Sequence, residues 1–185
     1  MGHIAQHFEA EPAPPGAHGL SEDRLREANI NPHTLLATDY LNHYNEVIML
    51  FEMLPDMPDC LEDVESWSPK TYEEHFRDST FQGKDLAIAA YRHASLEVRT
   101  RFENICAELD IRILELAHEA RNAWDREQTE RFRYICQNAQ MTLSPLLDQL
   151  NGAIHGSMDE SHVKAPKETM PDHGQTQADI DALFD

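Results

Sequence analysis

Basic residues, cysteines and long apolar runs are all scarce in this sequence of 185 residues. Only 15 Lys and Arg face 34 Asp and Glu, which gives a formal net charge of −19 with neutral histidine. Such a chain repels phosphate backbones and anionic lipid headgroups. No run of large apolar residues is longer than Val47 to Phe51, far short of the ~20 residues that cross a bilayer. We therefore expect neither a nucleic-acid partner nor a membrane partner.

The three cysteines, Cys60, Cys106 and Cys136, lie far apart and have no Cys-x-x-Cys spacing. An odd number of cysteines, without a basic-then-apolar signal sequence at the N-terminus, indicates reduced thiols. We therefore expect a cytoplasmic protein.

Glycine and proline are both missing between Gly83 and Pro145, so nothing in this stretch interrupts a helix. Apolar residues recur there at three- and four-residue steps. A single helix of about 60 residues fits this pattern. An antiparallel pair that turns near residues 125–128 also fits, with Asp125 capping the second helix and Gln128 completing a capping box. We favour the pair, because a compact chain needs its apolar stripes to face each other.

Shorter helices are predicted before this stretch. The patterns favour helices over 21–29, from the cap Thr34 to Pro55, over 71–79 and over 84–94. Residues 55–69 combine three prolines with five carboxylates and predict an irregular connector, pinned by Leu61, Val64 and Trp67. No strand alternation is present. The fold class is therefore all-α, an elongated helical hairpin or bundle.

The two ends of the chain differ in composition from the middle. Residues 1–20 are rich in proline and poor in apolar side chains, and predict a disordered tail before a helical domain over 21–156. Pro145 predicts a kink or a local break in the last helix, which Gly152 and Gly156 then end. Residues 157–175 are polar and predict a flexible linker, and 176–185 form a compact apolar and acidic peptide.

The terminal peptide has the pattern of a short amphipathic helix. Thr176 and Asp179 have the spacing of a capping box, and Ile180, Leu183 and Phe184 fall on one side of the helix that it begins. Helices shorter than about 12–15 residues are marginal in water. We therefore expect this peptide to fold only in the groove of a partner.

The string Gln177-Ala178-Asp179-Ile180-Asp181-Ala182-Leu183-Phe184 resembles a known peptide class. The flagellar motor switch protein, at its N-terminus, and the bacterial chemotaxis phosphatase, at its C-terminus, use such a peptide to bind the phosphorylated chemotaxis response regulator. The resemblance implies a receiver domain as the partner, and that domain would carry a divalent metal such as magnesium. It implies no cofactor of this chain's own. The residues implied to bind the partner are Asp179, Ile180, Asp181, Leu183 and Phe184.

A second resemblance lies at Phe76-Arg77-Asp78-Ser79-Thr80-Phe81-Gln82. The helical chemotaxis phosphatase, usually a dimer, carries an Asp and a Gln four residues apart in a Phe-x-Asp-x-Thr-x-Gln context. Residues at i and i+4 share one helical face. The resemblance implies that Gln82 would hold water in line with the aspartyl phosphate while Asp78 contacts the partner's lysine. Gly83, a typical residue after a helix end, follows Gln82 directly.

Two functions remain open from the sequence. The first is a phospho-aspartate phosphatase that acts on a response regulator, with a possible homodimer through the long helices. The second is a non-enzymatic adaptor that recruits or sequesters a response regulator or flagellar component. Asp39, His43 and Glu46 share one side of a predicted helix and could suit a divalent ion, but we expect them to form an exposed polar face.

Overall fold

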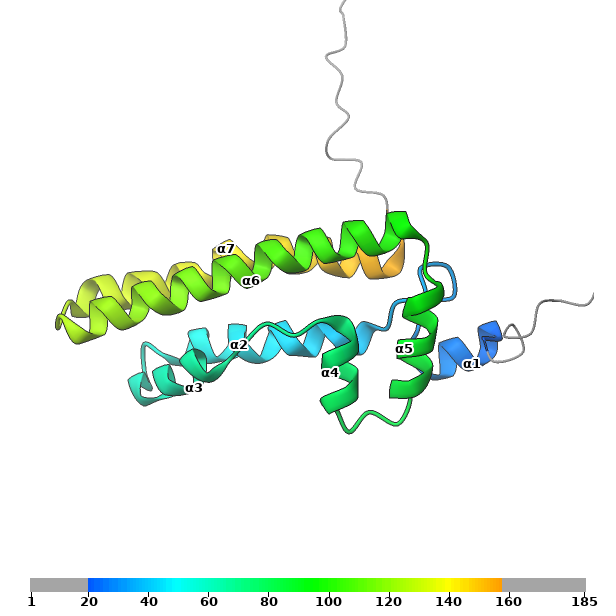
Figure 1. Ribbon diagram of the computed structural model, residues 1–185. Helices are drawn as coiled ribbons and strands as arrows, with labels where there is room; N and C mark the ends of the chain where they lie inside the picture. Colours follow the sequence, from blue (N-terminus) through cyan, green and yellow to red (C-terminus); the bar gives the residue numbers. More distant parts are fainter. Residues whose placement is uncertain (1–19, 158–185) are drawn as a thin grey trace, which may run out of the picture.

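The computed structural model describes residues 20–157, which form helices joined by short turns (Figure 1). The all-α fold class is confirmed: these residues contain no strand, and only Ile30 and Ala37 form an isolated β-bridge. The α-helices are α1 (Glu22–Glu27), α2 (Asn42–Met53), α3 (Leu61–Ser66), α4 (Tyr72–Asp78), α5 (Lys84–His93), α6 (Leu96–Asp125) and α7 (Thr129–His155), and the short 3-10 helices are η2 (Thr38–Leu41) and η3 (Pro58–Cys60).

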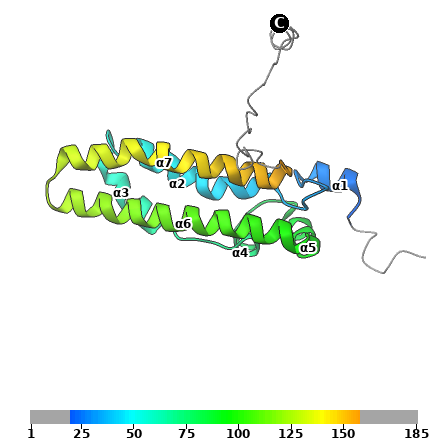
Figure 2. The ribbon, with the colours of Figure 1, turned by 90° about the horizontal axis from the view of Figure 1, so that it is seen from above.

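The long helices α6 and α7 lie antiparallel, side by side in both views of the molecule (Figures 1 and 2). The alternative of one continuous helix is therefore wrong. The turn is made by Glu127, whose φ of 56° is left-handed, and by the backbone N–H of Gln128, which donates to the Ala123 carbonyl at 2.9 Å. The predicted cap is also wrong, because Asp125 still belongs to α6. Gln128 occupies the N-cap position of α7 without a side-chain hydrogen bond.

Helix α7 continues through Pro145 to His155, so a break at this proline is not present. Pro145 is exposed, and its ring points away from the core that the helix covers. Gly152 lies inside the helix instead of ending it. Gly156 alone provides the left-handed C-cap, with φ of 74°.

Helix α2 packs beneath the hairpin and closes the core (Figure 1). Its apolar stripe, including Tyr44, Val47 and Phe51, is fully buried. Thr34 does not cap this helix as predicted, because the chain first forms η2 and the helix begins at Asn42. The Thr34 hydroxyl instead donates to the Ile154 carbonyl at 2.6 Å, which ties the segment before α2 to the end of α7.

The segment over 55–69 is more regular than an irregular connector, since it contains η3 and α3. Leu61 and Val64 are buried, as expected for side chains that pin it to the core. Arg121 of α6 pairs with Glu65 and fastens α3 from outside. No helix within residues 20–157 combines the length and apolar character that a bilayer crossing requires.

Helices α4 and α5 run across the direction of the long hairpin, near the N-terminal end of α6 (Figure 1). Thr71 begins α4 with a capping box: its hydroxyl accepts from the Glu74 N–H, and the Glu74 carboxylate accepts from the Thr71 N–H at 2.9 Å. Ser95 caps α6 in a similar way, through the Val98 N–H. These helices lie close to the predicted ranges.

Candidate functional site

The predicted pair Asp78 and Gln82 does not share a helix. Asp78 is the last residue of α4, and Gln82 lies in the turn over 79–83 that leads to α5. The expectation that both side chains project from one helical face is therefore wrong. The local cause is Ser79, whose backbone is extended and whose hydroxyl donates to the Phe76 carbonyl at 2.9 Å and accepts from the Phe81 N–H at 3.3 Å. These bonds compete with helical ones and end α4.

The turn over 79–83 is held in this shape from several sides. The Lys84 ammonium group donates to the carbonyls of Arg77 and Ser79 at 3.4 and 3.2 Å. Phe81 packs on Phe76, with ring centroids 5.7 Å apart. A Cβ on Gly83 would lie 2.7 Å from the Phe81 ring, so a larger residue there would force this ring to move. Extension of α4 to Gln82 would break these contacts.

The Asp78 side chain already takes part in an ion pair within the chain. Its carboxylate pairs with the Lys70 ammonium group at 2.9 Å. This hydrogen bond and charge lower the pKa of the Asp78 carboxyl below its usual range. Asp78 and Gln82 are both exposed, so a partner can reach each of them, but Asp78 must leave Lys70 before it can bind a second cation.

Cationic side chains gather around α4 and α5 in this acidic molecule. Glu73 binds Arg92 at 2.6 Å and Arg77 at 3.1 Å, which joins the two helices across their exposed side. These partners lower the pKa of the Glu73 carboxyl, with the Arg92 hydrogen bond the largest cause. The pairs are on the surface, where screening makes each worth little for stability.

His43 was expected on an exposed polar face, and this expectation is wrong because the side chain is only 6% exposed. Its ring stacks on Trp67 with centroids 4.9 Å apart, and the Trp67 indole N–H donates to the His43 carbonyl at 3.1 Å. Burial lowers the pKa of His43 to about 4, with smaller contributions from His75 and Lys70. The buried Nε2 atom has no hydrogen-bond partner within the described part of the chain. His43 is therefore a neutral imidazole at pH 7.

His75 of α4 lies beside His43, with ring centroids 5.8 Å apart, and stacks edge-on against Tyr40. Its partial burial lowers its pKa as well. Two imidazoles are not sufficient for a metal centre, and over residues 20–157 no group of three or more His, Cys, Asp or Glu has the arrangement to hold an ion. The combination of Asp39, His43 and Glu46 is thus not a metal site in this arrangement.

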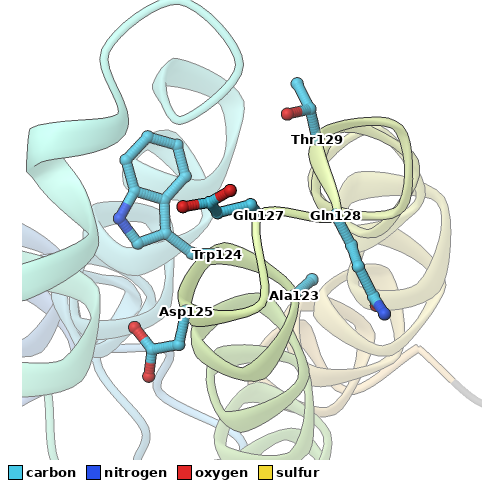
Figure 3. A pocket seen from close by; sticks show the side chains of 6 residues that line it. All are labelled: Ala123, Trp124, Asp125, Glu127, Gln128 and Thr129. Carbon is cyan, nitrogen blue, oxygen red and sulfur yellow. The ribbon is translucent and has the colours of Figure 1, made fainter.

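A hollow of about 370 Å³ lies at the turn of the hairpin (Figure 3). Trp124 and Glu127 point to one side of the turn, whereas Gln128 points to the other. The Trp124 ring also packs on Phe132, with centroids 5.1 Å apart. Because the polar groups do not converge on one point, this hollow does not have the geometry of a catalytic site.

The residues predicted to bind a partner, Asp179, Ile180, Asp181, Leu183 and Phe184, lie outside the described residues, as do most of the predicted tail and linker. Comparisons with known proteins give no match: no family model, no curated protein and no solved structure is similar to this chain. The functional argument therefore depends on the residues themselves.

Proposed function

We propose that this chain is a helical adaptor of bacterial two-component or chemotaxis signalling, which binds the phosphorylated receiver domain of a response regulator through residues 176–185. The observation that carries the proposal is the string Gln177–Phe184, in which a capping box precedes three large apolar residues at i, i+3 and i+4. The same string resembles the peptides by which two chemotaxis proteins bind that partner. The receiver would bring its own divalent metal, such as magnesium.

Such a peptide gives a weak and reversible interaction. Burial of three large apolar side chains favours binding, whereas the ordering of the peptide backbone opposes it. Tethering to the body raises the effective concentration of a captured partner near the helices to the order of millimolar. The tether therefore keeps a captured partner close to the helical body, where it can contact a second surface.

The geometry supports an adaptor better than a phosphatase. Catalysis by Asp78 and Gln82 needs both side chains in one acidic pocket of the receiver at the same moment. Gln82 is in a braced turn, and Asp78 is paired with Lys70. The phosphatase function would require this turn to become helical and the Lys70 pair to open when the receiver binds.

A homodimer through the long helices is a further part of the proposal. Ile111 and Leu114 are large apolar side chains exposed on the outer side of α6, away from α7. Their three-residue spacing places them on one face, where a second copy could cover them. We place the protein in the cytoplasm, where the receiver domains of response regulators act.

The binding test uses the full-length protein and a chemotaxis receiver domain activated with beryllofluoride. Replacing Ile180, Leu183 and Phe184 with alanine is expected to weaken binding at least about tenfold by calorimetry, because it removes the apolar side of the peptide. Val163→Ala, which changes an apolar residue of the same tail, is the matched control and should bind normally. Equal binding by both variants would refute the peptide assignment.

The catalytic test follows phosphate loss from the phosphorylated receiver with and without the full-length protein. An adaptor leaves the half-life unchanged or makes it longer. A phosphatase shortens it, and then Gln82→Ala should abolish the effect while binding survives. Gln140→Ala, an exposed glutamine on α7, is the control. Acceleration that depends on Gln82 would replace the adaptor function with the phosphatase one.

A further inference from the structure

Three exposed methionines form a continuous ridge along α2 and the turn after it. Met49, Met53 and Met57 are 59%, 39% and 51% exposed. Their spacing of four residues places them on one side, and the Met57 N–H donates to the Met53 carbonyl at 2.8 Å, so the helical path continues to the third. We call these three side chains the methionine ridge.

The methionine ridge points away from the hairpin. The buried residues of α2, among them Tyr44, Val47 and Phe51, form the opposite side of the helix. From Met49 to Met57 the ridge spans about 12 Å, or two helical turns. Methionine side chains are flexible and polarisable, which suits them to pack against apolar side chains of varied shape. The ridge thus offers a surface that a second helix can pack along.

Carboxylates border the methionine ridge. Glu46 and Glu52 lie three residues before and after Met49, and Asp56 lies three residues after Met53, so all three are its surface neighbours. We call them the carboxylate rim. They are exposed, and within residues 20–157 none of them forms an ion pair.

The chain segment that carries the ridge has one sign of charge as well; nearby cations come from outside it, where Arg121 pairs with Glu65 and Lys70 lines the same hollow as Glu46. No Lys or Arg occurs from Glu27 to Pro69, a segment with nine carboxylates: Glu27, Asp39, Glu46, Glu52, Asp56, Asp59, Glu62, Asp63 and Glu65. This field repels anionic lipid, nucleic acid and the chain's own acidic peptide over 176–185. It attracts a cationic partner, and the ridge selects one that has an apolar stripe.

We propose that the methionine ridge and its carboxylate rim form a docking surface for a basic amphipathic helix of a partner protein. The apolar stripe of that helix would lie along Met49, Met53 and Met57, and its Lys or Arg residues would face the rim on both sides. This surface is separate from the terminal peptide, so the proposal does not rest on the proposed function. An adaptor with both sites would hold two different partners at once.

The test uses full-length protein with ¹³C-labelled methionine methyl groups and a synthetic peptide of about 14 residues made only of Leu and Lys, with Leu at helical spacing. We expect the methyl signals of Met49, Met53 and Met57 to shift as peptide is added. Met141, which is 74% exposed on α7, is the internal control and should not move. Equal shifts at Met141 would mean non-specific binding and would overturn the proposal.

Two sets of variants separate the apolar and the charged contributions. M49Q/M53Q/M57Q should weaken peptide binding at least about tenfold, while M141Q should not. E46Q/E52Q/D56N should weaken it more than E97Q/E108Q/E119Q, which changes net charge equally on exposed positions of α6. Unchanged circular dichroism will show that the fold survives, as expected for exposed side chains.

Two other results would contradict the proposal. If the free protein is a dimer that M49Q/M53Q/M57Q converts to a monomer, the ridge binds a second copy and the proposal is wrong. If a Leu and Glu peptide of the same pattern binds as well as the Leu and Lys peptide, the charge argument fails and the proposal is overturned. Saturable binding that needs both ridge and rim supports it.

Discussion

His43 shows most directly how one buried polar residue affects this molecule. Its ring is stacked on Trp67 and lies beside His75, with Lys70 also contributing to its low pKa. The unfolded chain binds a proton on histidine near pH 6.5, whereas burial lowers the pKa of folded His43 to about 4. The folded state therefore binds fewer protons than the unfolded state between these values.

From this difference we predict that the free energy of unfolding is fully retained above pH 6.5 and decreases as the pH falls from 6.5 to about 4. Urea unfolding, followed by tryptophan fluorescence across this range, measures the decrease. His43→Phe keeps a ring against Trp67 without a titrating group, so its decrease should be smaller, with His75 contributing the remainder. His118→Phe, at an exposed position, should behave as the parent. An identical decrease in all three proteins would refute this role for His43.

The burial of His43 could have been predicted from the sequence, because it follows Tyr40 by three residues and precedes Val47 by four. Its residue type suggested exposure, and its register with the apolar stripe indicated the opposite. The role of Thr34, in contrast, could not have been predicted from the sequence. Its residue type is suited to a helix cap, but its bond to the Ile154 carbonyl joins positions 120 residues apart. No local pattern can indicate such a contact.

At the scale of elements, local signals located most helices. Thr71 and Ser95 mark two helix starts, and the hairpin follows from the apolar stripes of two long segments. Helix α3 was missed because Pro55, Pro58 and many carboxylates obscured the three-residue step from Leu61 to Val64. The prediction that Asp78 and Gln82 share one helical face was wrong because the hydroxyl of Ser79 ends α4.

The cap of α4 gives a measurable prediction. Thr71→Ala removes the hydroxyl that accepts from the Glu74 N–H and donates to the Glu74 carboxylate. We expect the free energy of unfolding to decrease by about 1 kcal/mol in urea denaturation, the usual effect of losing such a cap. Thr100→Ala, at an exposed position inside α6, should be neutral or slightly stabilising, because alanine is the better helix former. If the cap does not stabilise the protein, the two variants will have the same free energy of unfolding.

At the scale of the whole molecule, a single core joins all the helices, since buried side chains from α1 to α7 form one continuous cluster. The charge is as one-sided as the sequence indicates, and the ion pairs of the described residues engage few of the 34 carboxylates. Mutual repulsion of the remaining carboxylates opposes the compact state.

We therefore predict that salt stabilises this protein. Raising NaCl from about 0.01 M to about 1 M shortens the screening length from about 30 Å to about 3 Å and should raise Tm. Scanning calorimetry measures the change. E97Q/E108Q/E119Q, with three fewer charges, should show a smaller salt effect and a higher Tm at low salt. A Tm that falls with salt would mean that surface ion pairs outweigh the repulsion.

The described chain begins and ends at the same end of the long hairpin, and the turn at Glu127 lies at the other end (Figure 2). With 30 residues in α6, these ends are about 45 Å apart. The turn is exposed and distant from both chain exits, so it can accept a foreign insertion, such as a fluorescent domain, between Arg126 and Glu127. A reporter there would leave both chain exits unobstructed.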